Sequence, residues 1–283
     1  MKVRVLESAY IEQELFAAIQ SISFNPDPDI KFCLQKALDN ETSPLAKDIL
    51  MCMLQNLKAA ATDRIPLCQD TGSLVVFADI GCKLQILGDS LPIIVNNALR
   101  RATSELYLRA SMLKDPLFSR INTGDNTPAF FHCRINPGDS LKLKIAQKGG
   151  GAENMSRLKM FTPAASEADI IDFVVETVLL AGAKACPPLV IGVGIGGNFE
   201  TSAIMAKEAL LQPLLMHNQD LNYANLEEKM LKAVNNTGIG VQGMGGNYTA
   251  FAVHILEQPC HIASLPVAVN LQCHSHRHIS IEL

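Results

Sequence analysis

The densest run of reactive side chains is Cys68-Gln69-Asp70-Thr71, which Gly72 follows. It places a thiol, an amide, a carboxylate and a hydroxyl in consecutive positions, and so combines a metal ligand, hydrogen-bonding groups and a proton carrier. The apolar run Ser73–Ile80 comes next and predicts a buried strand. A polar loop that leads into a sheet is a common position for chemistry, although a capped turn with a structural cysteine explains this loop alone equally well.

Three of the eight cysteines share one feature, since each lies at the end of a predicted strand: Cys68, Cys186 and Cys273. Three thiolates are enough to hold a [4Fe–4S] cluster and leave one iron open. An open iron is a Lewis acid for a hydroxyl or a carboxylate. No Cys-x-x-Cys pair occurs, so spacing alone does not establish a cluster. Apolar neighbours indicate instead that some cysteines fill the core: Cys33, Cys52 and Cys82.

A long helix is predicted from Ser90 to about Leu113, and its apolar stripe includes Arg109. An unpaired guanidinium on a buried stripe would be costly. We interpret Arg109 as an anion clamp that points into a cleft. The alternative is an arginine whose charged head reaches solvent at the domain edge.

Glycine-rich turns recur along the chain. Gly149–Gly151 directly follow a predicted strand, which indicates that backbone approaches a ligand closely, although a flexible turn is the simpler alternative. Gly192-x-Gly194-x-x-Gly197 matches the dinucleotide fingerprint, but Gly238-x-Gly240-x-x-Gly243 matches it too, after a helix. Two matches in different contexts make nucleotide binding a weak alternative.

Two further patterns suggest a catalytic or metal site, but we favour an ordinary structural explanation for each. Asp70-Thr71-Gly72 is the aspartic-protease triplet, but it occurs once, whereas that chemistry needs two carboxylates. His274, His276 and His278 alternate and could bind zinc from one face of a strand. A solvated terminal strand is the explanation of the three histidines that we favour.

The order of predicted helices and strands along the chain indicates a mixed α/β fold, with helices packed around mixed sheets and a helical part over about residues 1–60. Ser43 and Ser166 are expected helix caps, with Pro44 at a first helical position. Another helix is expected from Asn225 to about Asn235, and residues 122–140 are expected to be an irregular loop. Without a repeat or a convincing linker, we expect one large domain over residues 1–283.

Composition excludes several functional classes. The net charge is −4, no basic run or tryptophan is present and aromatic residues are few, which argues against a nucleic-acid surface. We see neither a signal peptide nor an apolar run of membrane-spanning length, so we expect a cytoplasmic chain with no membrane partner. In that compartment eight cysteines are not expected to form a disulfide framework.

Four motifs together resemble the α subunit of class I fumarate hydratases and the related L(+)-tartrate dehydratases. They occur in the family's order between about Asp63 and His278: Ile65–Gly72, Lys148–Ser156, Ala185–Pro188 with Gly192–Asn198, and Gly238–Gly243. The resemblance implies an oxygen-sensitive hydro-lyase with a [4Fe–4S] cluster. It also implies that the three ligands of the cluster are Cys68, Cys186 and Cys273.

The same resemblance implies roles for further residues. Gln69 and Asp70 match residues that contact the substrate, and Arg109 matches an arginine that grips a substrate carboxylate. Gly151 matches a glycine whose backbone reaches the substrate. His261 matches a histidine near the cluster, so Asp70 and His261 are the expected catalytic residues for proton handling.

The implied reaction is reversible hydration of fumarate to L-malate, with dehydration of L(+)-tartrate to oxaloacetate as the alternative. The chain resembles only the cluster-bearing half of the single-chain enzymes. We therefore expect a β subunit, which would supply the base for the C3 proton, and pairing of two α chains. A non-catalytic metal-binding or regulatory module is a more distant alternative.

Overall fold

The computed structural model describes residues 3–25 and 27–283. Their contacts form two compact units, which are described separately below. Unit 1 comprises Met1–Asp27, Lys58–Gly149 and Arg277–Leu283, and unit 2 comprises Pro28–Leu57 and Gly150–His276. Within the described residues, no helix combines the length and the apolar character that a membrane span requires.

Unit 1 is built on a mixed four-stranded sheet in the order β10-β5-β2-β4. The strands are β2 (Ser73–Gly81), β4 (Phe130–Asn136), β5 (Leu141–Lys148) and β10 (Arg277–Glu282). β2 pairs in parallel with β4 and antiparallel with β5, and β10 pairs antiparallel with β5. A separate parallel pair joins β1 (Arg4–Glu7) and β3 (Leu84–Leu87).

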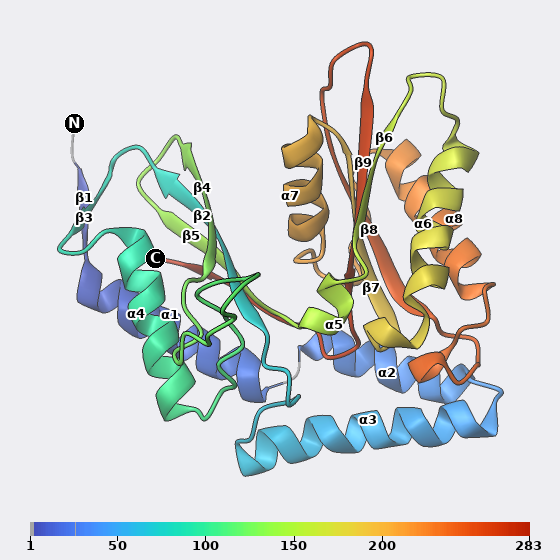
Figure 1. The fold of residues 1–283 in the computed structure, drawn as a ribbon, viewed down its shortest axis with the longest axis horizontal. Coiled ribbons are helices and arrows are strands. Elements are labelled where there is room, and N and C mark those ends of the chain that lie inside the picture. Colours follow the sequence, from blue (N-terminus) through green and yellow to red (C-terminus); the bar gives the residue numbers. More distant parts are fainter. Residues whose placement is uncertain (1–2, 26) are drawn as a thin grey trace. The chain divides into compact units, whose positions relative to one another are not determined.

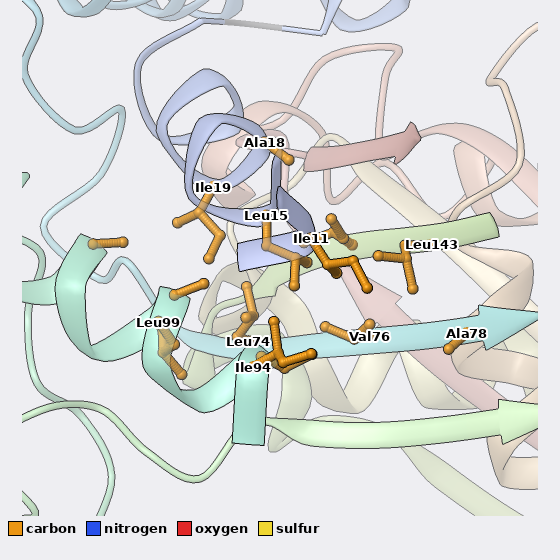
Figure 2. Packing of buried hydrophobic residues seen from close by; sticks show 14 of the residues in the cluster. Ile11, Leu15, Ala18, Ile19, Leu74, Val76, Ala78, Ile94, Leu99 and Leu143 are labelled. Atoms are coloured by element: carbon orange, nitrogen blue, oxygen red, sulfur yellow. The ribbon is translucent and has the colours of Figure 1, made fainter. Parts of the chain in front are cut away.

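Two helices of unit 1, α1 (Ser8–Phe24) and α4 (Leu91–Glu105), supply much of its core. Figure 2 shows apolar side chains of α1 and α4 packed with those of β2 and β5. The α1 residues recur at three- and four-residue intervals, as one helix face requires: Ile11, Leu15, Ala18 and Ile19. This core fixes β2, the strand that the Cys68 loop enters.

Unit 2 contains a second mixed sheet, in the order β6-β9-β7-β8. Its strands are β6 (Arg157–Phe161), β7 (Leu189–Gly196), β8 (Ala250–Gln258) and β9 (Leu265–Gln272). In Figure 1, α7 (Phe199–Ala209) covers one face, and α6 (Glu167–Ala181) and α8 (Leu221–Asn235) cover the other. Every residue of β7 is buried, as expected for a strand covered on both faces.

Gly192 and Gly194 lie inside β7 and not in a phosphate-binding turn. A Cβ atom at Gly192 would lie 2.0 Å from the carbonyl oxygen of Ala206, and one at Gly194 would lie 2.1 Å from that of Ser202. Both carbonyls belong to α7, so these glycines let the helix pack closely on the strand. Helix packing explains the glycine pattern without a nucleotide.

Several predicted elements are confirmed. Pro44 opens α3 (Pro44–Asp63), which contributes residues to both units. Ser166 and Asp169 form a reciprocal capping box at α6. Two predictions are wrong in detail: α8 begins at Leu221, because Asp220 caps it, and the 122–140 loop contains β4, paired with β2. Gly150–Glu153 form the short helix α5, so the flexible-turn alternative does not hold for Gly150 and Gly151. The helix α2 (Pro28–Asn40) is the next helix after α1 along the chain.

A buried carboxylate connects α2 and α3. Glu41 is 2% exposed and accepts hydrogen bonds from the backbone N–H groups of Thr42 (2.7 Å), Ser43 (3.0 Å) and Asn247 (2.8 Å). Burial acts to raise its pKa, but these bonds and the charge of Lys47 outweigh burial and lower the pKa from the ordinary value. Glu41 is therefore ionised in the folded chain over a wider pH range than in the unfolded chain.

Glu41→Gln is expected to reduce the free energy of unfolding at pH 7 by about 1.5–3 kcal/mol, the usual range for hydrogen bonds to a charged group. Because the folded pKa is lowered, this stabilisation is fully present above the unfolded pKa of about 4.3 and is lost as the pH falls through the folded value. Urea unfolding of both proteins between pH 7 and pH 3 measures the difference. Glu228→Gln, at an exposed position of α8, is the control. A difference that stays constant with pH would contradict the assignment.

Candidate functional site

The Cys68 loop of unit 1 is held in a defined conformation. Cys68 is partly buried, and its Sγ lies 3.5 Å from Oε1 of Gln69. The N–H of Gly72 donates to Oδ1 of Asp70 at 3.1 Å, which closes a side-chain turn. The loop therefore fixes the predicted ligand and the predicted proton carrier within three consecutive residues.

Gly72 seats this loop against the end of β5. Its φ is +75°, and a Cβ atom there would lie 2.4 Å from the carbonyl oxygen of Lys148 and 2.9 Å from the amide nitrogen of Gly149. The register pairs Ser73 with Lys148, so the loop and the predicted glycine turn lie at the same end of the sheet. Only glycine satisfies both the backbone conformation and the close approach.

Gly72→Ala is expected to destabilise the chain by about 2 kcal/mol or more, because strain and a backbone clash act together. Gly124→Ala is the matched control, since Gly124 also has a positive φ of 83° but its Cβ would meet nothing within 4 Å. The control should cost only about 1–2 kcal/mol from the left-handed conformation. Thermal unfolding measures the stability of both variants. Equal losses of stability in the two variants would show that the contact of Gly72 with β5 is unimportant.

Arg109 does not lie on a helix, and the predicted buried stripe is wrong at its end. α4 stops at Glu105, and Tyr107 adopts a left-handed conformation with φ of 54°. The chain turns here because Thr71 binds the next segment: its Oγ1 accepts the N–H of Arg109 at 3.0 Å. The side chain of Arg109 is exposed, while its backbone is joined to the Cys68 loop. The structure thus brings Arg109 to this loop by a route that the helix prediction missed.

Unit 2 brings Cys186 and Cys273 into neighbouring segments. The backbone N–H of His274 donates to the carbonyl oxygen of Cys186 at 3.3 Å. Because His274 directly follows Cys273, this hydrogen bond joins the segments of the two cysteines. Nδ1 of His274 lies 3.1 Å from the same oxygen and 3.1 Å from Nε2 of Gln242. Gln242 donates from its backbone and its side chain to the carbonyl oxygen of Pro187, at 2.8 and 2.9 Å.

Two residues of this network have unusual backbones. Cys186 has φ of 54° and Gln242 has φ of 52°, a left-handed region that residues with a Cβ atom rarely adopt. Such conformations persist where the surroundings fix them, and they concentrate at functional sites. Sequence reasoning assigned no role to Gln242, although it lies within the Gly238–Gly243 motif, and it considered His274 only as one of three possible zinc ligands.

Gly151 lies on α5 of unit 2 with its backbone exposed. A Cβ atom there would lie 3.0 Å from the carbonyl oxygen of Lys184, two residues before Cys186. The structure therefore places the predicted glycine beside the segment that leads into the second predicted ligand.

His261 is not placed near the two cysteines of unit 2. Cys186 and Cys273 adjoin the sheet end where Val190 pairs with Gln272, whereas His261 follows β8 beyond the opposite end, where Gly196 pairs with Gln258. Along a strand of this length the two ends lie roughly 20 Å apart. The strand register, which the sequence does not reveal, therefore corrects the expectation that His261 lies beside this pair.

The other histidines also differ from expectation. His276 is 2% exposed and precedes β10, so the solvated terminal strand is wrong for this residue. Among the residues that the structure describes, no group of three or more His, Cys, Asp or Glu side chains is arranged to hold a metal ion.

The cysteines fall into distinct exposure classes. The predicted ligands Cys68, Cys186 and Cys273 are partly buried, and no disulfide joins any of the eight cysteines, all of which the structure describes. The core-filler interpretation holds for buried Cys33 but is wrong for Cys52 and Cys82, which are exposed. Three thiols at strand ends, partly shielded from solvent, fit the donor set that an iron–sulfur cluster requires.

Comparisons with known proteins agree on one family. The family model described as Fumarate hydratase (Fumerase) matches residues 12–282. A protein of Methanocaldococcus jannaschii, provisionally named L(+)-tartrate dehydratase subunit alpha, is 38% identical over 256 residues, which cover 88% of this chain and 89% of that protein. The L(+)-tartrate dehydratase subunits alpha of Escherichia coli K12 and Shigella sonnei are each 32% identical over 260 residues, covering 90% of this chain and 85% of theirs.

Proposed function

The chain belongs to the fumarate hydratase (Fumerase) family, and we propose that it is the α subunit of an iron–sulfur hydro-lyase that acts on a four-carbon dicarboxylate. The observation that carries this proposal is the family match over residues 12–282, which includes the Cys68 loop and all three predicted ligands. The relatives' names as alpha subunits support a β subunit as partner. Pairing of two α chains is a further part of the proposal.

Cys68, Cys186 and Cys273 would hold a [4Fe–4S] cluster. When bound, such a cluster with an open iron supplies a Lewis acid for a substrate hydroxyl or carboxylate. The hydrogen bonds of His274 and Gln242 hold the segments of Cys186 and Cys273 next to each other. The turn at Gly72 fixes the conformation of the loop that carries Cys68.

The protein's own residues would bind and orient the dicarboxylate. Arg109 offers an exposed planar guanidinium, which can hold a carboxylate by two parallel hydrogen bonds. Gln69 adds an amide beside Cys68, and the exposed backbone of Gly151 adds polar groups on unit 2. Each of these groups recognises a negatively charged or hydroxylated small molecule.

Asp70 is the candidate for proton handling on this subunit. Its Oδ1 accepts the N–H of Gly72, which orients the carboxylate within the loop. A carboxylate held in this way can deliver or receive a proton at a departing hydroxyl group. The base that removes the carbon-bound proton is proposed to come from the β subunit. His261 has no role in this scheme within its own unit, because of its position at the opposite sheet end.

Two reactions remain as candidates. Reversible hydration of fumarate to L-malate follows from the family to which the chain belongs. Dehydration of L(+)-tartrate to oxaloacetate is favoured by one specific observation, the names of the relatives at 38% and 32% identity. Tartrate differs from malate by one hydroxyl group, so residues of the partner subunit are expected to share in the choice.

The test is co-expression of this chain with its partner subunit, anaerobic purification, reconstitution with iron and sulfide, and assays on fumarate, L-malate and L(+)-tartrate. We expect turnover of at least one of these substrates by the complex and none by this chain alone. Robust turnover by this chain alone, or inactivity of the loaded complex on all three, would contradict the proposal. The ratio of kcat/KM values assigns the substrate.

A further inference from the structure

A buried arginine lies directly beneath the Asp70 loop in unit 1. Arg277 opens β10, and its side chain is only 2% exposed. Its Nη2 donates to the backbone carbonyl oxygen of Asp70 at 2.9 Å. Among the described residues this is the one hydrogen bond of the guanidinium, whose Nε and Nη1 have no acceptor and which forms no ion pair with a carboxylate.

Strand pairing explains how a residue 207 positions away reaches Asp70. Arg277 pairs with Gln147 of β5, and Ser73 of β2 pairs with Lys148 of β5, so the starts of β10 and β2 flank the end of β5. A Cβ atom at Gly149 would lie 3.2 Å from Oδ2 of Asp70 and 4.0 Å from Nη2 of Arg277. Arg277 and the Asp70 carboxylate therefore both border Gly149, which itself adds no side chain there.

The energetics indicate a positional role. A guanidinium that is 2% exposed has lost most of its hydration, and only well-formed polar contacts offset that cost. What it provides is a charge-assisted hydrogen bond to the carbonyl of Asp70. The side chain of the same residue is bound separately by the N–H of Gly72. Two independent bonds thus fix the backbone and the carboxylate of a single residue.

We propose that Arg277 is a positioning residue that acts on the reaction through Asp70. This inference rests on the proposed function, in which Asp70 handles a proton. It assigns to a buried arginine, which none of the sequence motifs singled out, the task of holding that carboxylate within reach of the substrate. A misplacement of about 1 Å at a catalytic group is enough to lower rates by about 10²-fold.

A double-mutant cycle tests the coupling in the reconstituted complex. Arg277→Met removes the hydrogen bond and should lower kcat by at least about tenfold in the parent, with KM changed by less than about threefold. In an Asp70→Asn background the same change should lower kcat by less than about threefold, because residues that act as a unit are not additive. Arg277→Lys keeps the charge and should recover part of kcat. Arg134→Met, on β4, is the control arginine, and it should leave kcat unchanged.

Hydrogen exchange of the full chain, without cluster or substrate, tests the same inference independently of activity. Arg277→Met should speed exchange in peptides covering residues 68–72 by about tenfold and leave α4 unchanged. Arg277→Lys serves as the second variant if the methionine variant does not fold. Equal kcat losses in both Asp70 backgrounds, or no change in exchange at residues 68–72, would overturn the inference. Inactivity of the parent complex would refute the proposed function alone, since the exchange measurement still decides the role of Arg277.

Discussion

Serine in place of Cys68, Cys186 or Cys273 is expected to abolish incorporation of an iron–sulfur cluster. Thiolate is the soft ligand that these clusters require, and an alcohol does not replace it. All three cysteines are partly buried, and in unit 2 the segments of Cys186 and Cys273 are joined through His274. Iron and sulfide content after anaerobic reconstitution, with the visible absorbance of the cluster, measures the loss.

The other cysteines provide matched controls for this experiment. Cys52 and Cys82 are exposed, so serine at either position should change neither folding nor iron content. Serine at buried Cys33 should lower stability slightly and leave the cluster intact. If all six variants lost iron equally, or if none did, the assignment of the three ligands would be wrong.

Arg109→Lys is expected to reduce kcat/KM of the complex by about 10²-fold or more. The charge is kept, but the planar fork that holds a carboxylate by two hydrogen bonds is lost, and loss of a charged hydrogen bond costs about 2–5 kcal/mol. Arg109→Met should be worse for activity, because the charge is lost as well. Steady-state kinetics on the accepted dicarboxylate measures both variants.

A measurement of thermal stability distinguishes an arginine that binds the substrate from one that stabilises the fold. The side chain of Arg109 is exposed, so Arg109→Met should shift the thermal midpoint of the full chain by no more than a surface substitution does. Arg100→Met, which breaks an exposed ion pair with Asp125, is the control for both measurements. Strong destabilisation by Arg109→Met, or unchanged kcat/KM in both Arg109 variants, would place the clamp elsewhere.

Sequence patterns within a few residues of each other were sufficient to predict many of the helices and strands. The apolar run after Gly72 became β2, because a continuous apolar run suits a strand buried in a core. Ser166 and Asp169 cap α6 as their spacing predicts, since both bonds of the capping box are formed within four residues. The loop position of Cys68-Gln69-Asp70 followed from the same local reasoning.

Non-local pairing accounts for what the sequence could not reveal. The end of α4 depends on the bond between Thr71 and Arg109, which are 38 positions apart, so helical periodicity carried the prediction too far. The position of His261 depends on the register of β8 against β7. The burial of Arg277 depends on the pairing of β10 with β5, and no local pattern reports such a pairing.

Anaerobic reconstitution of the full chain is the most direct test of the central claim that this subunit carries the cluster. We expect about four iron and four sulfide ions per chain, with a visible absorbance that oxygen removes. We also expect none of this in a variant with serine at Cys68, Cys186 and Cys273 together. A folded parent chain that takes up no iron, or a triple variant that takes up as much as the parent, would contradict the claim.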